Sequence, residues 1–344
     1  MTLTHHDPIR LAIIGAGIFA HKVHLPALQA SGLFEIVAVY SQTRASASGL
    51  VDQMAESVDI YTDLAALLAR PDIEAVDIVL PITVMPNVVA RVLQAGKHVV
   101  SEKPIAPDVA TGRRLLARYA EHPGQVWMVA ENWRYEDAFE QAAEVIRAGE
   151  IGRPLLCDWT LHKPITPDNE YYQTAWRQVP AYPGGYALDA GVHHAAVLRM
   201  ILGDIREVSA VTAQVRSDLP PLDTLSASLQ FANGVLGTYL VTFAVGAPWP
   251  PALRITGESG ALRVWSNELT VTREATSHTR PVKANRGVEA ELVAFAQAVR
   301  AQQPHRNTPV EALQDLAIVE AMLRSAETGL KVRPEIIIAK PEPN

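Results

Sequence analysis

The sequence is poor in cysteine. Cys157 is the only one among its 344 residues, so the chain cannot form an internal disulfide bond. Sparse cysteine is typical of proteins from reducing compartments, and we therefore expect a cytoplasmic location. Within the fold, we expect Cys157 to pack as a small hydrophobic side chain in a strand.

The chain also lacks long apolar runs and an excess of positive charge. No apolar run reaches the roughly 18 residues that a membrane-spanning helix needs, and the first eight residues do not read as a signal peptide. The net charge of −7 argues against nucleic acid and anionic membrane as partners. Hydrophobic residues at 48% and charged residues at 19% instead indicate a globular protein, long enough for two domains.

A glycine-rich motif follows the first apolar run. Residues 10–14 predict a strand, and residues 15–20 read G-A-G-I-F-A, the G-x-G-x-x-A form of the dinucleotide fingerprint. Gly15 allows the tight turn, and Gly17 lets the backbone approach a pyrophosphate at the N-terminus of a helix predicted over 19–30. A glycine turn without a ligand is the alternative.

The end of the next predicted strand, 34–40, bears on the choice of cofactor. NAD-selective enzymes usually place Asp or Glu here to hold the ribose 2′-hydroxyl, and this chain has neither. Ser41 and Thr43 offer hydroxyls and Arg44 offers a cation, which suit a 2′-phosphate. We predict NADP(H), with NAD(H) as the alternative, in which case Arg44 is only a solvated residue that opens a helix.

The rest of the first half alternates short strands with helices, which predicts a doubly wound parallel sheet. The further strands are expected at 59–61, 75–80, 98–100 and 126–130. His21 and His24 lie one helical turn apart, but no other ligand stands at a supporting spacing. We therefore predict no metal site.

A lysine stands at the end of the predicted strand 98–100, where the chain reads S-E-K-P. Ligands bind at the carboxyl ends of parallel strands, and an ammonium group there needs a partner or a task. Proline restrains the residue before it to an extended conformation, which directs the Lys103 side chain. We predict that Lys103 faces a substrate beside a nicotinamide ring. A structural turn formed by Glu102 and Lys103 is the alternative.

The second half is dominated by short strands with turn breaks, which predict a large, mainly antiparallel open sheet. Asn233-Gly234 is a hairpin signal within it. Two helices follow, at 288–301 and 310–327. Because one face of an open sheet needs a cover, we expect a homo-oligomer.

Residues 184–194 carry the second set of chemical groups. Asp189 and His193 have i, i+4 spacing, so on a helix they share one face, where a carboxylate could orient a histidine that acts as a general base. His194 is the reserve candidate for the base. The alternative is that Asp189 only caps the helix.

The stretch from His162 to Pro180 has no clear periodicity. Long irregular loops in compact domains often line sites, and this one offers aromatic rings and donors suited to a sugar-like ring. Its candidate residues are Lys163, Asp168, Tyr171, Tyr172, Trp176 and Arg177. A lid or an interface without substrate contact is the alternative.

Taken together, the motifs resemble a known enzyme family. The segment A-G-K-H-V at 95–99 followed by E-K-P at 102–104, and the glycines at 184–185 followed by Asp189 and His193, resemble the glucose–fructose oxidoreductase/inositol dehydrogenase (Gfo/Idh/MocA) family. The resemblance covers nearly the whole chain. It implies an α/β Rossmann domain at 1–130 that binds NAD(P), followed by an α+β domain at 131–344 for substrate binding and oligomerisation. Whether the C-terminal helices pack back on the first domain is left open.

The resemblance also assigns residues. Lys103, Asp189 and His193 match the family's catalytic residues. The predicted cofactor-binding residues are Gly15, Gly17, Ile18, Phe19, Ser41, Thr43, Arg44, Leu80, Pro81, Glu102 and Lys103. The predicted substrate-binding residues are Lys103, Trp133, Arg134, Tyr171, Trp176, Arg177, Asp189, His193 and His194.

Two departures from the family pattern concern polarity. Met85 stands where the family often has histidine, and Ala196 stands where many members carry Asp. Both changes remove a polar group, which argues against a strict inositol or glucose substrate.

The implied activity is reversible hydride transfer between a nicotinamide cofactor and a secondary alcohol or carbonyl of a sugar, a polyol or a related small cyclic compound. We expect no nucleic acid or membrane partner, and a homodimer or homotetramer formed through the open sheet. The alternatives are a redox-assisted, NAD-dependent glycosidase and a non-enzymatic, dinucleotide-binding regulator.

Overall fold

The chain forms two units in the computed structural model, which describes residues 7–265, 268–283 and 286–338. The first unit contains the chain up to Asn132, then Val288–Leu313 and the chain from Ile338. The second unit contains Trp133–Gly287 and Gln314–Ile337. The first unit is therefore discontinuous in sequence. The predicted boundary at residue 130 stays a prediction.

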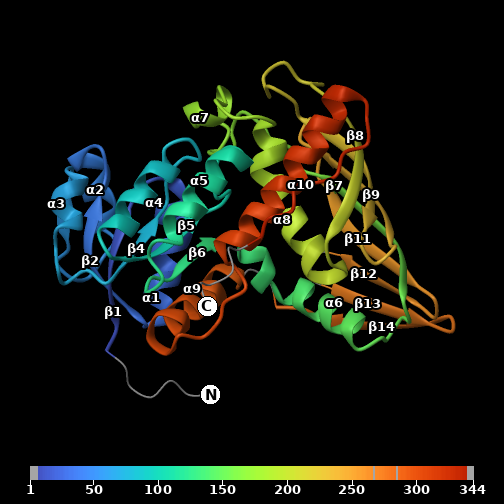
Figure 1. Ribbon diagram of the computed structural model, residues 1–344, viewed down its shortest axis with the longest axis horizontal. Helices are drawn as coiled ribbons and strands as arrows, with labels where there is room; N and C mark the ends of the chain where they lie inside the picture. Colours follow the sequence, from blue (N-terminus) through green and yellow to red (C-terminus); the bar gives the residue numbers. More distant parts are fainter. Residues whose placement is uncertain (1–6, 266–267, 284–285, 339–344) are drawn as a thin grey trace. The chain divides into compact units, whose positions relative to one another are not determined.

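The first unit is built on a parallel sheet of six strands in the order β3-β2-β1-β4-β5-β6 (Figure 1). Apart from the edge strand β3, these strands are short apolar runs that are largely buried on both faces. Their bounds are β1 Ile9–Ile14, β2 Phe34–Tyr40, β3 Asp59–Tyr61, β4 Ala75–Ile78, β5 His98–Glu102 and β6 Trp127–Ala130. The prediction of a doubly wound parallel sheet is confirmed.

Helices connect these strands, and three of them begin at a residue whose side chain accepts a backbone N–H. Thr43 caps α2, Asp63 caps α3 and Asp108 caps α5, which satisfies donors that a helix start leaves unpaired. The bounds are η1 Ala20–His24, α1 Leu25–Ser31, α2 Arg44–Val51, α3 Leu64–Leu68, α4 Met85–Gln94 and α5 Val109–Tyr119.

A helix from the far end of the chain completes the core of the first unit. α9 (Gly287–Ala301) contributes Leu292 and Phe295, both fully buried, to the cluster that contains Leu11 and Leu28. The Phe295 ring stacks on Phe34 of β2 with centroids 6.4 Å apart.

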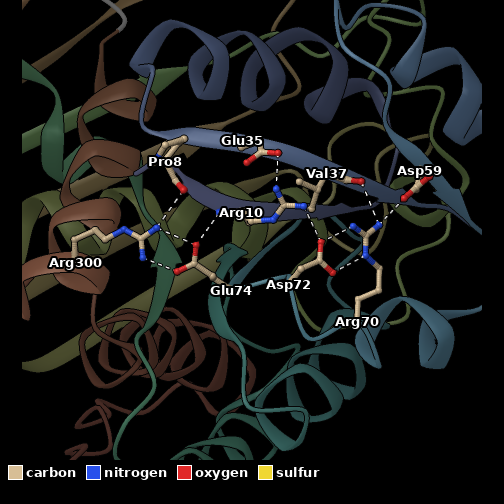
Figure 2. Close-up of polar contacts among 9 residues, drawn as sticks. All are labelled: Pro8, Arg10, Glu35, Val37, Asp59, Arg70, Asp72, Glu74 and Arg300. Atoms are coloured by element: carbon tan, nitrogen blue, oxygen red, sulfur yellow. Dashed lines mark hydrogen bonds and ion pairs between the residues drawn. The ribbon is translucent and has the colours of Figure 1, made fainter. Parts of the chain in front are cut away.

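Charged residues at the start of β1 tie the first unit together (Figure 2). Arg10 pairs with Glu35 at 2.6 Å and with Asp72 at 2.8 Å. At the end of α9, Arg300 pairs with Glu74 at 2.5 Å and donates to the Pro8 carbonyl at 3.1 Å. The hydrogen bond from Arg300 holds the pKa of Glu74 below its usual value. Elements that are distant in sequence are thus joined at the amino-terminal ends of β1, β2 and β4.

The second unit is built on an eight-stranded sheet in the order β14-β13-β12-β11-β7-β10-β9-β8. Every neighbouring pair is antiparallel except β7 and β10, which run parallel. The strands are β7 Pro154–His162, β8 Ile205–Ala213, β9 Thr224–Phe231, β10 Leu236–Thr242, β11 Trp249–Gly257, β12 Ala261–Trp265, β13 Glu268–Arg273 and β14 Thr276–Pro281. The mainly antiparallel sheet and the hairpin at Asn233-Gly234 are confirmed, whereas β14 was not predicted because its residues, all exposed, show no alternation.

Within the second unit, helices pack on the sheet. α6 (Asp137–Arg147) contacts β12, β13 and α8 (Gly185–Leu202), and α8 contacts β9. The short α7 (Ala175–Gln178) lies in the segment predicted to be irregular, and α10 (Pro309–Thr328) is the last helix. Cys157 is buried in β7, where burial raises the pKa of its thiol to about 12. None of the helices in the described part of the chain combines the length and apolar character of a membrane span.

Candidate functional site

The fingerprint loop of the first unit has the geometry of a phosphate cradle. Gly15 has φ +109°, and a Cβ there would come within 2.2 Å of the Val79 carbonyl oxygen, so only glycine fits. Gly17 is exposed, and a Cβ there would meet nothing within 4 Å. The loop is therefore tight against β4 at its first glycine and open at its second, as a bound pyrophosphate requires.

The helix predicted over 19–30 is present but not regular throughout. Ile18 and Phe19 are α-helical, and a π-helical turn follows over Ala20–His24, in which the Leu25 N–H donates to the Ala20 carbonyl five residues earlier. Regular α1 then starts with Pro26 in its first turn. The turn directs His24 into the protein, where it is fully buried.

The residues predicted to select the cofactor lie at the end of β2. The Thr43 hydroxyl accepts the Ser46 N–H at 3.2 Å as the cap of α2, so it has a structural task. Arg44 is exposed as the first residue of α2, and Ser41 is half-buried. The argument for a 2′-phosphate consequently rests on Ser41 and Arg44.

The ends of β4 and β5 bring the remaining predicted cofactor residues to the same loop. The Leu80 side chain lies 3.1 Å from the position of a Cβ on Gly15. Lys103 is half-buried, and its backbone N–H donates to Oε2 of Glu102 at 3.2 Å. The other oxygen of Glu102, Oε1, lies 2.8 Å from Nε2 of His24.

Two residues in this region were missed at the level of sequence. The spacing of His21 and His24 suggests at most a metal ligand, and Asp77 lies inside the strand predicted at 75–80. The signal was present, because a carboxylate inside an apolar run requires a partner. The structure supplies it: Nδ1 of His24 lies 2.8 Å from Oδ2 of Asp77. In the described ranges, no three His, Cys, Asp or Glu side chains are grouped so that they could hold a metal ion.

In the second unit, α8 carries Asp189 and His193 one turn apart. Its first turn requires glycine, because Gly185 has φ +51° and a Cβ there would lie 2.6 Å from the Pro220 carbonyl. Asp189 accepts a hydrogen bond from Nε of Arg177 at 3.1 Å. The Arg177 guanidinium also lies over the rings of Trp176 and Tyr171, at 4.0 and 5.2 Å from their centroids.

The His193 ring is stacked on an indole. Its centroid is 5.1 Å from that of Trp133, with 12° between the planes, and the Lys163 ammonium lies 4.6 Å from the same indole. His194, by contrast, is buried, with Nδ1 at 2.6 Å from the Tyr239 hydroxyl. Both rings pack against Trp133, but His193 is only half-buried, whereas His194 lies in the core.

Arg134, predicted to bind substrate, forms a buried ion pair. Its Nη2 lies 2.5 Å from Oδ2 of Asp315 in α10, and both side chains are at most 4% exposed. Arg199 of α8 binds the other carboxylate oxygen at 2.8 Å. The guanidinium of Arg134 is thus engaged within the second unit.

Two further tyrosines lie beside Asp189 and were not singled out from the sequence. Burial and the charge of Asp189 raise the pKa of Tyr182, and burial raises that of Tyr186 to about 12. Their hydroxyl groups are buried and have no hydrogen-bond partner among the residues that the structure describes. Such groups bind readily to a ligand that offers a partner.

The family is identified by comparison with known proteins. Residues 9–130 match the oxidoreductase family with an NAD-binding Rossmann fold, and residues 139–263 match the GFO/IDH/MocA C-terminal domain. The chain belongs to the GFO/IDH/MocA family. Like its relatives it is an NAD(P)-binding oxidoreductase, and the resemblance seen in the motifs is confirmed.

Individual relatives span nearly the whole chain. Dehydrogenase FPY6 of Fusarium mangiferae is 36% identical, covering 92% of this chain and 96% of its own. The crystal structure of an oxidoreductase from Thermotoga maritima has 35% identity and a TM-score of 0.89, covering 95% of this chain and 98% of its own. A D-xylose 1-dehydrogenase (NADP(+)) of Haloferax volcanii is 27% identical, covering 93% of this chain and 98% of its own.

Proposed function

We propose that this GFO/IDH/MocA protein transfers a hydride between NADP(H) and a secondary alcohol or carbonyl of a sugar, a polyol or a related small cyclic compound. The observation that carries the proposal is the arrangement on α8, where Asp189 and His193 lie one turn apart and Arg177 holds the Asp189 carboxylate. The similarity to a D-xylose dehydrogenase that uses NADP(+) supports both the substrate class and the cofactor.

The residues of the first unit fit a dinucleotide. Gly15 and Gly17 would hold the pyrophosphate, Arg44 and Ser41 the 2′-phosphate, and the segment from Glu102 to Lys103 the nicotinamide half. When bound, the nicotinamide ring accepts or donates the hydride.

The proton is handled by the protein. His193 takes the proton of the substrate hydroxyl during oxidation and returns it during reduction, as a histidine does near neutral pH. The stacked indole of Trp133 limits rotation of the imidazole. Lys103 donates a hydrogen bond to the reacting oxygen and stabilises its negative charge, while Asp189, held by Arg177, orients the substrate.

The test of this mechanism is the variant His193→Ala. General acid–base catalysis contributes about 10²–10⁴-fold, so kcat should fall at least about tens-fold when D-xylose and a panel of pentoses, hexoses and polyols are oxidised with NADP+. The dissociation constant for NADPH should not change. A variant with near-normal kcat would exclude His193 as the base.

Cofactor preference is tested separately. NADPH and NADH are each titrated into the protein, and the change in protein fluorescence reports binding. We expect tighter binding of NADPH than of NADH. Arg44→Ala should raise the dissociation constant for NADPH at least tenfold and leave that for NADH unchanged, because NADH has no 2′-phosphate. Tenfold tighter binding of NADH by the wild-type protein would contradict the assignment of Ser41 and Arg44.

We further propose that a second copy of the chain covers the outer face of the eight-stranded sheet. Leu156 of β7 and Leu236 of β10 pair in register, and each is 54% exposed, so a partner would remove adjacent leucines from water. Light scattering should show a dimer or tetramer that Leu236→Glu disrupts. The single cysteine also fits our proposal of a cytoplasmic enzyme.

A further inference from the structure

A buried charge cluster lies beneath the dinucleotide site of the first unit. The His24 and Asp77 side chains are fully buried, and that of Glu102 is 13% exposed. Nδ1 of His24 faces Asp77 and Nε2 faces Glu102, both at 2.8 Å. The imidazole thus bridges the carboxyl-terminal ends of β4 and β5.

The arrangement fixes the protonation of His24. A neutral imidazole has one donor and one acceptor nitrogen, so it can serve only one of two carboxylates; an imidazolium serves both. Burial opposes the charge, but Asp77 and Glu102 together outweigh it, and the pKa of His24 lies well above its usual value.

Other acidic groups face the cluster from α9 and from the end of β6. Burial, together with Glu102 and Glu131, raises the pKa of Glu291 well above its usual value, which favours the neutral form of Glu291. Asn307 donates to Oε2 of Glu291 at 3.1 Å and to the Glu131 carbonyl at 3.0 Å. The imidazolium of His24 is therefore balanced by Asp77 and Glu102.

Three segments that carry predicted cofactor residues meet at this one side chain. The fingerprint loop leads into the π-turn that ends at His24, and the Phe19 ring packs edge-on against the imidazole at 5.2 Å. Asp77 lies two residues before Val79, whose carbonyl packs against Gly15. Glu102 uses its second oxygen to accept the Lys103 N–H.

We propose that His24 is a positioning residue of the dinucleotide site. As a buried imidazolium it holds the ends of β4 and β5, and with them the Leu80-Pro81 and Glu102-Lys103 segments, against the fingerprint loop. The inference rests on the proposed binding of the nicotinamide half by these segments. Hydride transfer is not needed to test it.

The first measurement concerns the wild-type protein. Nitrogen NMR of the 15N-labelled histidines, assigned with His24→Asn, should show both ring nitrogens of His24 in the imidazolium state at pH 7.5. If no histidine of the wild-type protein shows both ring nitrogens protonated at that pH, the proposal is overturned even if the variant does not fold.

The second measurement compares NADPH with adenosine 2′,5′-bisphosphate, which lacks the nicotinamide half. In His24→Asn the dissociation constant for NADPH should rise at least tenfold and that for the bisphosphate less than twofold, because the segments that His24 holds do not include Ser41 or Arg44. If the wild-type protein prefers NADH, the two probes are NADH and 5′-AMP in place of NADPH and the bisphosphate. Equal losses for both probes would show a merely structural role and overturn the proposal.

The matched control is His278→Asn, which makes the same substitution at an exposed histidine of β14 in the second unit. The dissociation constants for NADPH and for the bisphosphate should both stay within twofold of wild type. If His278→Asn weakens NADPH binding as much as His24→Asn does, the loss is not specific to His24 and the proposal is overturned.

Discussion

At the scale of single residues, the buried ion pair between Arg134 and Asp315 predicts that Arg134 stabilises the fold and does not bind substrate. Arg134→Met would leave the Asp315 carboxylate buried beside Arg199, without its ion pair to Arg134. Breaking a buried pair typically costs about 3–5 kcal/mol. We expect the free energy of unfolding in urea to fall by about that amount, with KM unchanged in the molecules that remain folded.

The control for this prediction is Arg153→Met, which breaks the exposed pair with Glu258 at 2.9 Å. Exposed pairs contribute roughly 0–1 kcal/mol, so the control should unfold almost as the wild type does. If Arg134→Met raises KM without loss of stability, the prediction is wrong and Arg134 binds substrate.

The kinds of residue at the candidate site could be predicted from the sequence, but their partners could not. Lys103, Asp189 and His193 stand out because a charged or titratable group interrupts an apolar pattern. The partners of His24 lie 53 and 78 residues further along the chain, and that of Arg134 lies 181 residues away. Only the folded sheet and helices bring such groups together, so no local spacing reveals them.

At the scale of elements, the two glycines of the fingerprint loop have different tasks. Gly17→Ala places a methyl group in open space, so the melting temperature should not change. Because the methyl group would occupy the surface that a pyrophosphate approaches, NADPH affinity should fall at least about tenfold. Fluorescence titration and thermal unfolding measure the two effects.

Gly15→Ala is the comparison variant for the loop. Its Cβ would clash with the Val79 carbonyl at a left-handed φ, so stability itself should fall. If Gly17→Ala binds NADPH as the wild type does, the loop is not the pyrophosphate site.

Regular elements were predictable, and their irregular ends were not. Apart from the edge strand β3, the parallel strands of the first unit follow from short apolar runs that are largely buried on both faces. The helix predicted over 19–30 is present, but residues 20–24 form a π-turn that places His24 in its buried position against Asp77 and Glu102. Those contacts are tertiary, so helical periodicity does not contain them.

At the scale of the whole molecule, the first unit depends on a helix, α9, that comes after the main segment of the second unit, Trp133–Gly287, in sequence. Phe295→Ala would empty a fully buried site against Phe34, and such truncations cost about 3–5 kcal/mol. Urea unfolding should show this loss. Leu330→Ala, which truncates a side chain that is 67% exposed, should change stability by less than about 0.5 kcal/mol.

The same dependence predicts the behaviour of a shortened chain. A protein that ends at Asn132 lacks Leu292 and Phe295 and leaves apolar side chains of the β1–β2 region uncovered. It should bind a dye for exposed hydrophobic surface and fail to give a cooperative thermal transition. A stable, cooperative fragment would contradict the assignment of α9 to the core.

Stability should depend on pH through His305. Burial lowers the pKa of His305 to about 4, whereas the unfolded chain takes up the proton near pH 6.5. The contribution of neutral His305 is therefore fully present above pH 6.5 and is lost as pH falls toward 4, by up to about 1.4 kcal/mol per pH unit.

His305→Asn should remove this part of the pH dependence. The difference in unfolding free energy between pH 7.5 and pH 5 should shrink by about 2 kcal/mol relative to wild type. The exposed His278→Asn is the control and should behave as the wild type does. Equal slopes in all three proteins would show that His305 has an ordinary pKa.

The parallel pairing of β7 with β10 has a consequence for how the molecule folds. β7 lies between β10 and β11, and its Asp158 meets Thr238 across 80 residues and Arg254 across 96. Closing such long loops costs conformational entropy before the strand pairing contributes any stabilisation. This order of events slows folding. α8, with Asp189 and His193, lies within the loop that closes. We therefore expect catalytic competence to appear late in refolding, after the hairpins of the sheet have formed.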